Sequence, residues 1–221
     1  MNSCVLCNSL LDEKLTFCDL LTLTKPKARA CDTCFEKFQR ISAQHCPKCY
    51  RDGMGEACMD CQVWIKKGKE VSHKSCFVYN EAMKDFFSQY KFQGDYALYS
   101  VFTEVLQKEL KRYSDYMLVP IPISAKKYQT RGFNQVTALL EGTKLPFKEV
   151  LEKHDTIAQS SKTREERLQS QQCFKVKDKV TIPAKILLID DIYTTGSTLQ
   201  DAKQILVENG VKEIMTFSLA R

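Results

Sequence analysis

Residues 185–199 bring together the side chains of this sequence that are best suited to chemistry. The apolar run at 186–189 predicts a buried strand, and two adjacent carboxylates, Asp190 and Asp191, follow it. A short loop of hydroxyl side chains around one glycine precedes a predicted helix. Free N–H groups at the start of a helix can hold a phosphate, and carboxylates accept hydrogen bonds from sugar hydroxyls. The pattern predicts a site for a phosphorylated ribose; an ordinary strand–helix unit with a capped helix is the alternative.

This segment resembles the binding motif for phosphoribosyl pyrophosphate (PRPP) in type I phosphoribosyltransferases. The resemblance implies that Asp190 and Asp191 hold the 2′- and 3′-hydroxyls of the ribose, that Mg²⁺ accompanies PRPP, and that the following loop wraps the 5′-phosphate. That loop consists of Thr194, Thr195, Gly196, Ser197 and Thr198. Thr194 stands where purine-salvage members carry an acidic residue, and a threonine cannot act as a general base at neutral pH. Purine salvage is therefore disfavoured.

The spacing of the cysteines predicts metal sites. The chain has 11 cysteines, and eight of them form four Cys-x-x-Cys pairs within the first 61 residues. Thiolates in such pairs are typical ligands of tetrahedral zinc, and a reducing compartment disfavours disulfides. The predicted ligands are Cys4, Cys7, Cys31, Cys34, Cys46, Cys49, Cys58 and Cys61. Sequential pairing gives one Zn²⁺ to the first four and another to the last four; interleaved pairing is the alternative.

The charge balance disfavours a generally basic protein. The sequence carries 33 basic and 27 acidic side chains, a formal charge of +6. A Zn²⁺ bound by four thiolates carries about −2, so two such sites bring the chain to about +2. Any contact with nucleic acid must then come from local patches. We see no signal-peptide core and no membrane-spanning apolar run, which predicts a soluble cytoplasmic protein that reaches a membrane only through partners.

The elements around these motifs predict a chain in two parts. Residues 1–70 contain the cysteine pairs and little apolar periodicity, so we expect a small zinc-ribbon domain that depends on its metals. Residues 71–221 alternate helical and extended patterns, with a strand expected at 116–119. Helices are expected around 83–90, 98–110 and 136–140. The predicted fold class is therefore α/β, with a mostly parallel sheet that follows the cysteine-rich domain.

A basic group follows the strand expected at 116–119. Lys126, Lys127 and Arg131 come after Pro122. In a fold of this kind, the loop after an early strand faces the diphosphate, and three cations there could neutralise it together with Mg²⁺. The alternative is a solvated basic loop.

The chain as a whole resembles the ComF family of competence proteins. The resemblance rests on residues 119–122, 131–135, 190–198 and 217–221, and on Tyr79, Lys91 and Gly94. One loop matches less well: Gln159, Arg167 and Phe174 fit the family, but an expected asparagine falls near Ser170.

The resemblance implies a type I phosphoribosyltransferase fold with an N-terminal double zinc ribbon and a role in natural transformation. In that role, incoming single-stranded DNA is handled inside the cell together with the family's helicase-like ATPase, ComFA. A pocket for PRPP or another phosphorylated ribose would lie in the same domain. A phosphoribosyltransferase that acts on an unknown acceptor is the alternative.

Overall fold

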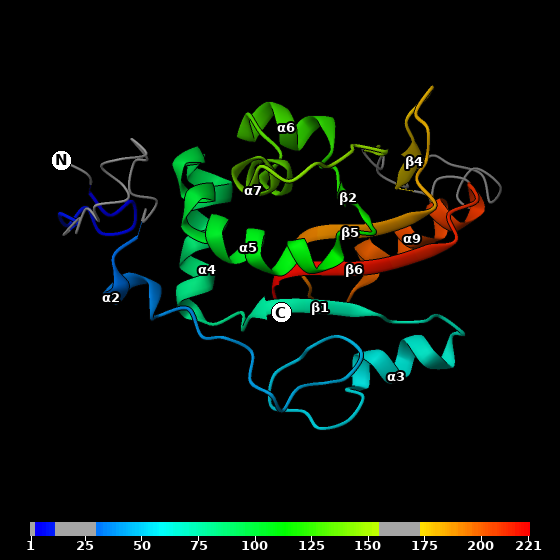
Figure 1. Ribbon diagram of the computed structural model, residues 1–221, viewed down its shortest axis with the longest axis horizontal. Helices are drawn as coiled ribbons and strands as arrows, with labels where there is room; N and C mark the ends of the chain where they lie inside the picture. Colours follow the sequence, from blue (N-terminus) through cyan, green and yellow to red (C-terminus); the bar gives the residue numbers. More distant parts are fainter. Residues whose placement is uncertain (1–2, 12–29, 155–172) are drawn as a thin grey trace, which may run out of the picture.

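The computed structural model describes residues 3–11, 30–154 and 173–221 (Figure 1). Gln159, Arg167 and Ser170, which belong to the weakly matching loop, lie outside the described residues. Within the described ranges, no helix has the length and apolar character that a membrane crossing requires.

A parallel sheet of four strands forms the centre of the fold. The strands are β1 (His73–Phe77), β2 (Met117–Pro120), β5 (Lys185–Ile192) and β6 (Glu213–Ala220), in the spatial order β1-β6-β5-β2. Every neighbouring pair runs parallel. The carboxyl ends of the strands therefore meet at one edge of the sheet, where ligands of open α/β sheets bind.

The strands differ from the predicted pattern in two respects. Strand β5 continues to Ile192, so Asp190 and Asp191 lie within the strand and not after it. Strands β1 and β6 were not predicted, because buried polar side chains such as His73 and Ser218 interrupt their apolar pattern. Strand β2 lies one residue further along the chain than its apolar run indicates.

The helices expected from periodicity are present, although the second is divided into two. The described helices are α2 (Asp32–Phe35), α3 (Met59–Lys66), α4 (Glu81–Ser88), α5 (Thr103–Leu110), α6 (Ala125–Arg131), α7 (Gln135–Thr143) and α9 (Ser197–Glu208). A π-helical turn η1 (Gln89–Gln93) and 3₁₀ turns η2 (Tyr96–Phe102) and η3 (Lys111–Tyr113) join them. A separate antiparallel pair consists of β3 (Leu151–Lys153) and β4 (Phe174–Val176).

Alternate side chains of β5 contact two hydrophobic layers, one on each face of the sheet. Leu187 and Ile189 pack with residues of α4, α5 and α7. Ile186 and Leu188 pack with residues of α9. In Figure 1, α5 lies in front of the sheet and α9 lies behind it. This arrangement carries β5 through the middle of the core and fixes the position of its acidic end.

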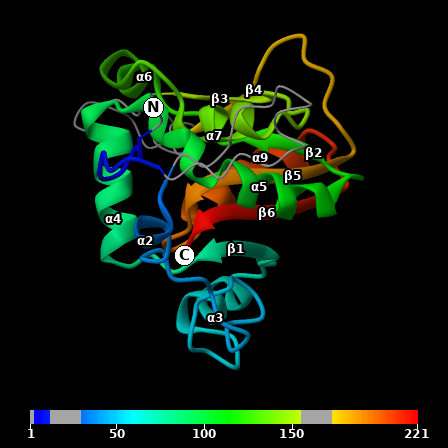
Figure 2. The same cartoon turned by 60° about the vertical axis from the view of Figure 1, so that its left-hand side comes forward.

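The cysteine-rich region packs against both layers. Phe38, just after α2, is 6% exposed, and its ring lies 4.8 Å from that of Phe102. The second group of cysteines belongs to the layer that contains α9. Figures 1 and 2 both show α2 beside α4 and α3 next to β1. The α/β class with a parallel sheet and a preceding cysteine-rich region is confirmed; the domain boundary between residues 70 and 71 stays a prediction.

Candidate functional site

The two carboxylates of β5 lie in different environments at the edge of the sheet. Asp191 is 5% exposed, and Lys91 Nζ lies 2.6 Å from its Oδ2. This contact is an ion pair by distance, but its geometry is not that of a hydrogen bond, so Oδ2 has no hydrogen-bond donor among the described residues. Ile192 N donates to Asp191 Oδ1 at 2.8 Å. Asp190 is half-buried, and its Oδ1 accepts a hydrogen bond from Asp191 N at 2.9 Å.

Lys91 is a site residue to which only the family resemblance pointed. It lies in η1, and its ammonium group sits over the ring of Phe87, 4.5 Å from the ring centroid. Its carbonyl oxygen accepts a hydrogen bond from Arg131 Nε at 3.0 Å. Turns of π-helix are frequent at functional sites, and they break the 3.6-residue periodicity from which helix faces are predicted. That break explains why periodicity alone does not place Lys91 beside Asp191.

Asp190 has an unusual protonation equilibrium. Burial raises the pKa of Asp190 to about 8, and the charge of Asp191 adds to this effect. Lys91 compensates only part of the negative charge, because it faces Asp191. In the free protein at neutral pH, Asp190 therefore holds a proton, and a bound cation would favour its ionised form.

The loop after β5 makes a left-handed glycine turn at the start of α9. Gly196 has a φ of 82° and precedes α9; a Cβ atom there would lie 2.2 Å from Tyr193 Oη. Only glycine suits this position, because the backbone is left-handed and the tyrosine ring fills the space. Ser197 N donates to Thr195 Oγ1 at 3.4 Å, which orders the hydroxyls. The first N–H groups of α9 have no partners within the helix and can bind an anion.

The structure separates the predicted basic group into two environments. Lys126 and Lys127 are exposed on α6. Arg131, at the end of the same helix, is half-buried and donates to the side chain of Gln135 as well as to Lys91 O. Burial lowers the pKa of Arg131, and the nearby charge of Asp191 opposes this change. Arg131 therefore belongs to the network around the acidic pair, whereas the two lysines form an exposed surface.

A cleft with a volume of about 540 Å³ lies beside this network. It is bounded by the end of β2, by α6 and by the β3–β4 pair, and it contains none of residues 190–198. Pro120, Pro122 and Tyr128 give it an apolar side, and Glu149 and Lys177 lie on its wall as an ion pair of 2.7 Å. It is a neighbouring space, distinct from the loop at 194–198.

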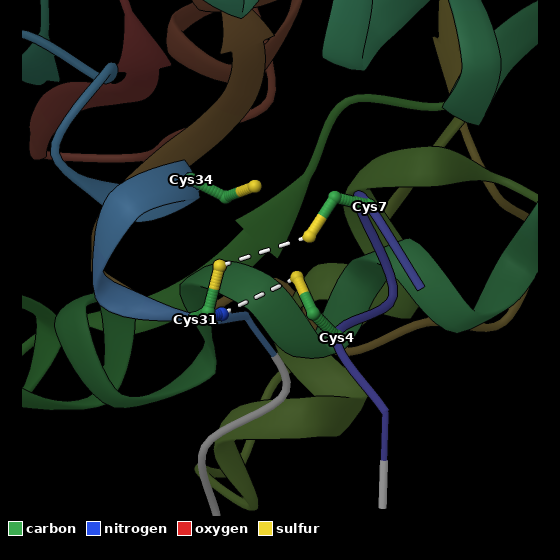
Figure 3. A group of neighbouring side chains, drawn as sticks. All are labelled: Cys4, Cys7, Cys31 and Cys34. Carbon is green, nitrogen blue, oxygen red and sulfur yellow. Dashed lines mark hydrogen bonds between the residues drawn. The ribbon is translucent and has the colours of Figure 1, made fainter. Parts of the chain in front are cut away.

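The first four cysteines converge from two segments of the chain (Figure 3). Cys4 and Cys7 lie in an N-terminal turn, while Cys31 and Cys34 lie at the start and in the body of α2. The four Sγ atoms all lie within 4.8 Å of one another, and those of Cys7 and Cys31 are 3.8 Å apart. Cys31 N donates a hydrogen bond to Cys4 Sγ at 3.3 Å, which joins the two segments.

The second four cysteines repeat this arrangement. Cys46 and Cys49 lie in a turn, and Cys58 and Cys61 lie at the start and in the body of α3. The Sγ atoms of Cys46 and Cys61 are 3.8 Å apart, and those of Cys49 and Cys58 are 3.5 Å apart. Cys58 N donates to Cys46 Sγ at 3.4 Å, the same bond between equivalent positions.

The backbone shows that the two groups are copies of one local structure. Asn8 and Tyr50, each four residues after the first cysteine of its group, have φ values of 59° and 61°. Their N–H groups donate to the carbonyl oxygens of Cys4 and Cys46 at 2.8 and 3.0 Å. The cysteine spacing therefore encodes the same turn-and-helix unit twice.

Both groups fit a tetrahedral metal ion. Zn–S bonds of about 2.3 Å place the sulfur atoms about 3.8 Å apart. The separations of 3.5 to 3.8 Å between the three sulfur pairs named above agree with this spacing, and the described cysteines form no disulfide. The two cysteine tetrads are positioned to bind metal ions, and their composition is that of the sequential pairing.

Comparison with solved structures gives only partial overlaps. A hypoxanthine phosphoribosyltransferase from Staphylococcus aureus aligns with 56% of this chain and 62% of its own, with 18% identity and a TM-score of 0.34. A phosphoribosylpyrophosphate synthetase from Mycobacterium smegmatis covers 54% of this chain and 33% of its own, with 16% identity and a TM-score of 0.32. No protein-family model matches the chain.

Similarity to curated proteins extends over the whole chain. Competence protein ComFC of Streptococcus pneumoniae is 48% identical over 218 residues, which cover 99% of both proteins. Competence protein ComFC of Bacillus subtilis is 34% identical and covers 99% of this chain and 94% of its own. Competence protein F of Haemophilus influenzae is 26% identical over 86% of this chain and 84% of its own. The chain belongs to the ComFC family of competence proteins.

Proposed function

We propose that this protein handles incoming single-stranded DNA during natural transformation, in the cytoplasm and together with the helicase-like ATPase ComFA. Its membership of the ComFC family supports a role in competence. We further propose that its phosphate loop binds PRPP or another phosphorylated ribose with Mg²⁺, and that each cysteine tetrad holds one Zn²⁺.

One observation carries the ligand proposal: a buried carboxylate oxygen without a donor next to a loop suited to phosphate. Asp191 Oδ2 has the charge of Lys91 beside it but lacks a hydrogen-bond donor among the described residues. The Lys91 ammonium group stabilises this oxygen by its charge, and a ribose hydroxyl can add a hydrogen bond to it. Asp190, which reaches the surface, can accept from the adjacent hydroxyl. The phosphate of the same sugar would then receive N–H groups from the start of α9.

The balance of charge in this site suits an anionic ligand. Lys91 offsets one carboxylate, and Asp190 holds a proton near neutral pH because its pKa is raised to about 8. The free site therefore repels phosphate less than two ionised carboxylates would. Bound Mg²⁺ would neutralise the diphosphate of PRPP, and Lys126, Lys127 and Arg131 on α6 would add protein cations for that group or for DNA phosphates.

Phosphoribosyl transfer to an unknown acceptor is the second candidate, and the 540 Å³ cleft favours it. The cleft adjoins the end of β2, at the edge where α/β proteins bind ligands, and the Tyr128 side chain offers an aromatic surface. Thr194 at the loop start supplies no general base. An acceptor would therefore have to react without the base that purine-salvage enzymes provide at this position.

Ligand binding can be tested by the melting temperature of the zinc-loaded protein with PRPP and Mg²⁺. A ligand that binds only the folded state stabilises it by about 2.7 kcal/mol at 100 times its dissociation constant. We expect wild-type protein to respond and Asp190→Ala to lose the response. Asp85→Ala, which removes an exposed carboxylate from α4, is the matched control and should respond as wild type does. An equal response from both variants would place the ligand elsewhere.

DNA binding can be tested by titration with single-stranded DNA at several salt concentrations. Each neutralised phosphate contributes about 0.7 to the logarithmic salt slope for single strands. Loss of Lys126 and Lys127 to alanine should lower that slope, and PRPP with Mg²⁺ should compete with the DNA. If neither change affects DNA affinity, the α6 surface is not where DNA binds.

A further inference from the structure

The second cysteine tetrad contacts the phosphate loop directly through α3. Trp64, three residues after the last cysteine of this tetrad, donates its indole N–H to Thr195 O at 2.8 Å. The ring is half-buried and lies below Lys67 Nζ, which is 5.1 Å from the ring centroid. The helix that carries Cys61 and the loop are thus joined by one hydrogen bond across 131 residues of sequence.

Arg221 makes a second connection, and its guanidinium group spans the two sites. On one side, Nη1 donates to Thr194 O at 2.5 Å. On the other side, Nε and Nη2 each lie 3.4 Å from Cys49 Sγ, and Nη2 lies 3.1 Å from Asp60 Oδ2. The side chain is only 8% exposed, so water competes weakly for these contacts. The same guanidinium therefore contacts a metal-binding thiol and the backbone of the phosphate loop.

Arg221 also contacts the ring of Tyr193, which packs against the loop. Its guanidinium carbon lies 4.8 Å from the centroid of the Tyr193 ring, and that ring fills the space beside Gly196. Tyr193 also packs against His73, whose ring centroid lies 4.2 Å away. Displacement of Arg221 would therefore release both the Thr194 carbonyl group and the ring that shapes the turn.

The charge of the metal-loaded tetrad determines how firmly Arg221 is held. A Zn²⁺ bound by four thiolates leaves about two negative charges, which a buried guanidinium stabilises by charge-assisted hydrogen bonds. Without the metal, no metal–sulfur bond fixes the Cys49 Sγ atom that lies 3.4 Å from Arg221 Nε and Nη2. That contact of the guanidinium group then has a movable partner. Occupied and empty tetrads thus differ in how firmly Arg221 is held.

The first tetrad provides an internal comparison. It has the same internal geometry, but no hydrogen bond or ion pair among the described residues joins it to residues 193–199. Its neighbours Val5, Leu6 and Phe35 pack with the layer on the opposite face of the sheet from α9. Metal at the first tetrad should therefore have no direct effect on the loop.

We infer that Arg221 and Trp64 are positioning residues that couple metal occupancy of Cys46, Cys49, Cys58 and Cys61 to the phosphate-binding conformation of the loop. This inference extends the proposed function, since the coupled ligand is the phosphorylated ribose assigned to that loop. Coupling between two sites is reciprocal. Metal at the second tetrad strengthens phosphate binding, and the bound phosphoribosyl ligand slows metal release from that tetrad alone.

The first experiment needs no ligand. Hydrogen–deuterium exchange of peptides that cover residues 193–199 is measured on zinc-loaded Arg221→Gln and on Arg51→Gln. Arg51 also contacts Asp60, at 3.7 Å, but does not touch the loop, so it is a matched control. We expect faster loop exchange in Arg221→Gln and wild-type exchange in Arg51→Gln. Equal exchange in the two variants would overturn the inference.

A conservative variant covers the case in which Arg221→Gln does not fold. Trp64→Phe keeps an aromatic ring and removes only the N–H donor to Thr195. It should also speed exchange of the loop peptides while both zinc ions remain bound. Unchanged exchange in this variant would show that the indole hydrogen bond does not hold the loop, and the inference would fail for Trp64.

The second experiment follows zinc release to a chelator with and without PRPP and Mg²⁺. Trp64 is the single tryptophan of the chain, so the release phase that changes its fluorescence belongs to the second tetrad. We expect PRPP to slow this phase about 5-fold or more, the lower range of measured allosteric couplings, and to leave the other phase unchanged. Arg221→Gln should abolish the effect, and Arg51→Gln should keep it.

The two proposals fail in different ways. If PRPP changes neither melting temperature nor zinc release, but loop exchange still depends on Arg221, the PRPP site is wrong and the mechanical connection stands. If PRPP stabilises the protein but slows both zinc phases equally, or neither, the coupling is wrong and the PRPP site stands.

Discussion

Replacement of Asp190 by asparagine is expected to stabilise the free protein at alkaline pH while it weakens ligand binding. The pKa of this carboxyl is raised from 3.8 to about 8, first by burial and then by the charge of Asp191. Because the folded pKa exceeds the unfolded one, the folded protein holds the proton more tightly. This contribution to stability is complete below about pH 4 and is lost as the pH rises toward 8.

The magnitude follows from the same values. Where the unfolded chain has lost the proton and the folded chain still holds it, stability falls by about 1.4 kcal/mol per pH unit. Between pH 6 and pH 8 this amounts to about 2 kcal/mol, since ionisation of the folded protein flattens the last part of the curve. Asp190 is half-buried and interacts with Asp191, so we expect about 1 to 2 kcal/mol.

Urea unfolding of the zinc-loaded protein at pH 6 and pH 8, without PRPP, measures this effect. The stability of Asp190→Asn relative to wild type should increase by that amount between the two pH values. Asp85→Asn, at an exposed position of α4, should follow the wild-type pH dependence. Parallel curves for wild type and Asp190→Asn would refute the assigned environment of Asp190. A larger loss of stability in Asp190→Asn than in wild type at pH 8 would mean that the folded protein lowers the pKa of Asp190 and does not raise it.

Three further predictions concern metal, the ion pair and the loop. Metal analysis of the purified protein should give two zinc ions per chain; one or none would contradict the two tetrads. Lys91→Met should destabilise the protein by about 3 kcal/mol in urea unfolding, because it leaves Asp191 buried without its cation; no change would mean that the ion pair is not formed. Gly196→Ala should cost more stability than Gly210→Ala, since both have positive φ but only Gly196 faces the Tyr193 ring. Equal losses would show that the ring yields to the added methyl group.

Local features of the sequence predicted the two cysteine groups and the strand and helix on either side of the loop at 194–198. The cysteine tetrads could be assigned because each pair is close in sequence, and the two pairs of a tetrad follow one another along the chain. The apolar run before Asp190 and the spacing after Gly196 predicted β5 and α9, since both elements carry their patterns within a single segment. Only the end of the strand was misjudged, because carboxylates are rare inside a buried strand.

Features that depend on tertiary contacts were not predictable in the same way. Lys91 reaches Asp191 from a π-helical turn that has no periodic signature. The contacts of Trp64 with Thr195 and of Arg221 with Cys49 join segments more than 100 residues apart, so spacing gave no indication of them. Arg131 was predicted to face the diphosphate together with Lys126 and Lys127, and spacing gave no indication that its side chain is half-buried and donates to the Lys91 carbonyl oxygen.

The most direct test of the central claim is to map PRPP binding by backbone amide resonances of isotope-labelled, zinc-loaded protein. With Mg²⁺ present, PRPP should shift the amides of residues 195–198 and of the Asp190–Asp191 pair at the lowest ligand concentrations. The Asp190→Ala variant should show much weaker shifts. Shifts confined to other parts of the chain, or none at PRPP concentrations that saturate any thermal stabilisation, would contradict a phosphoribosyl site at the end of β5.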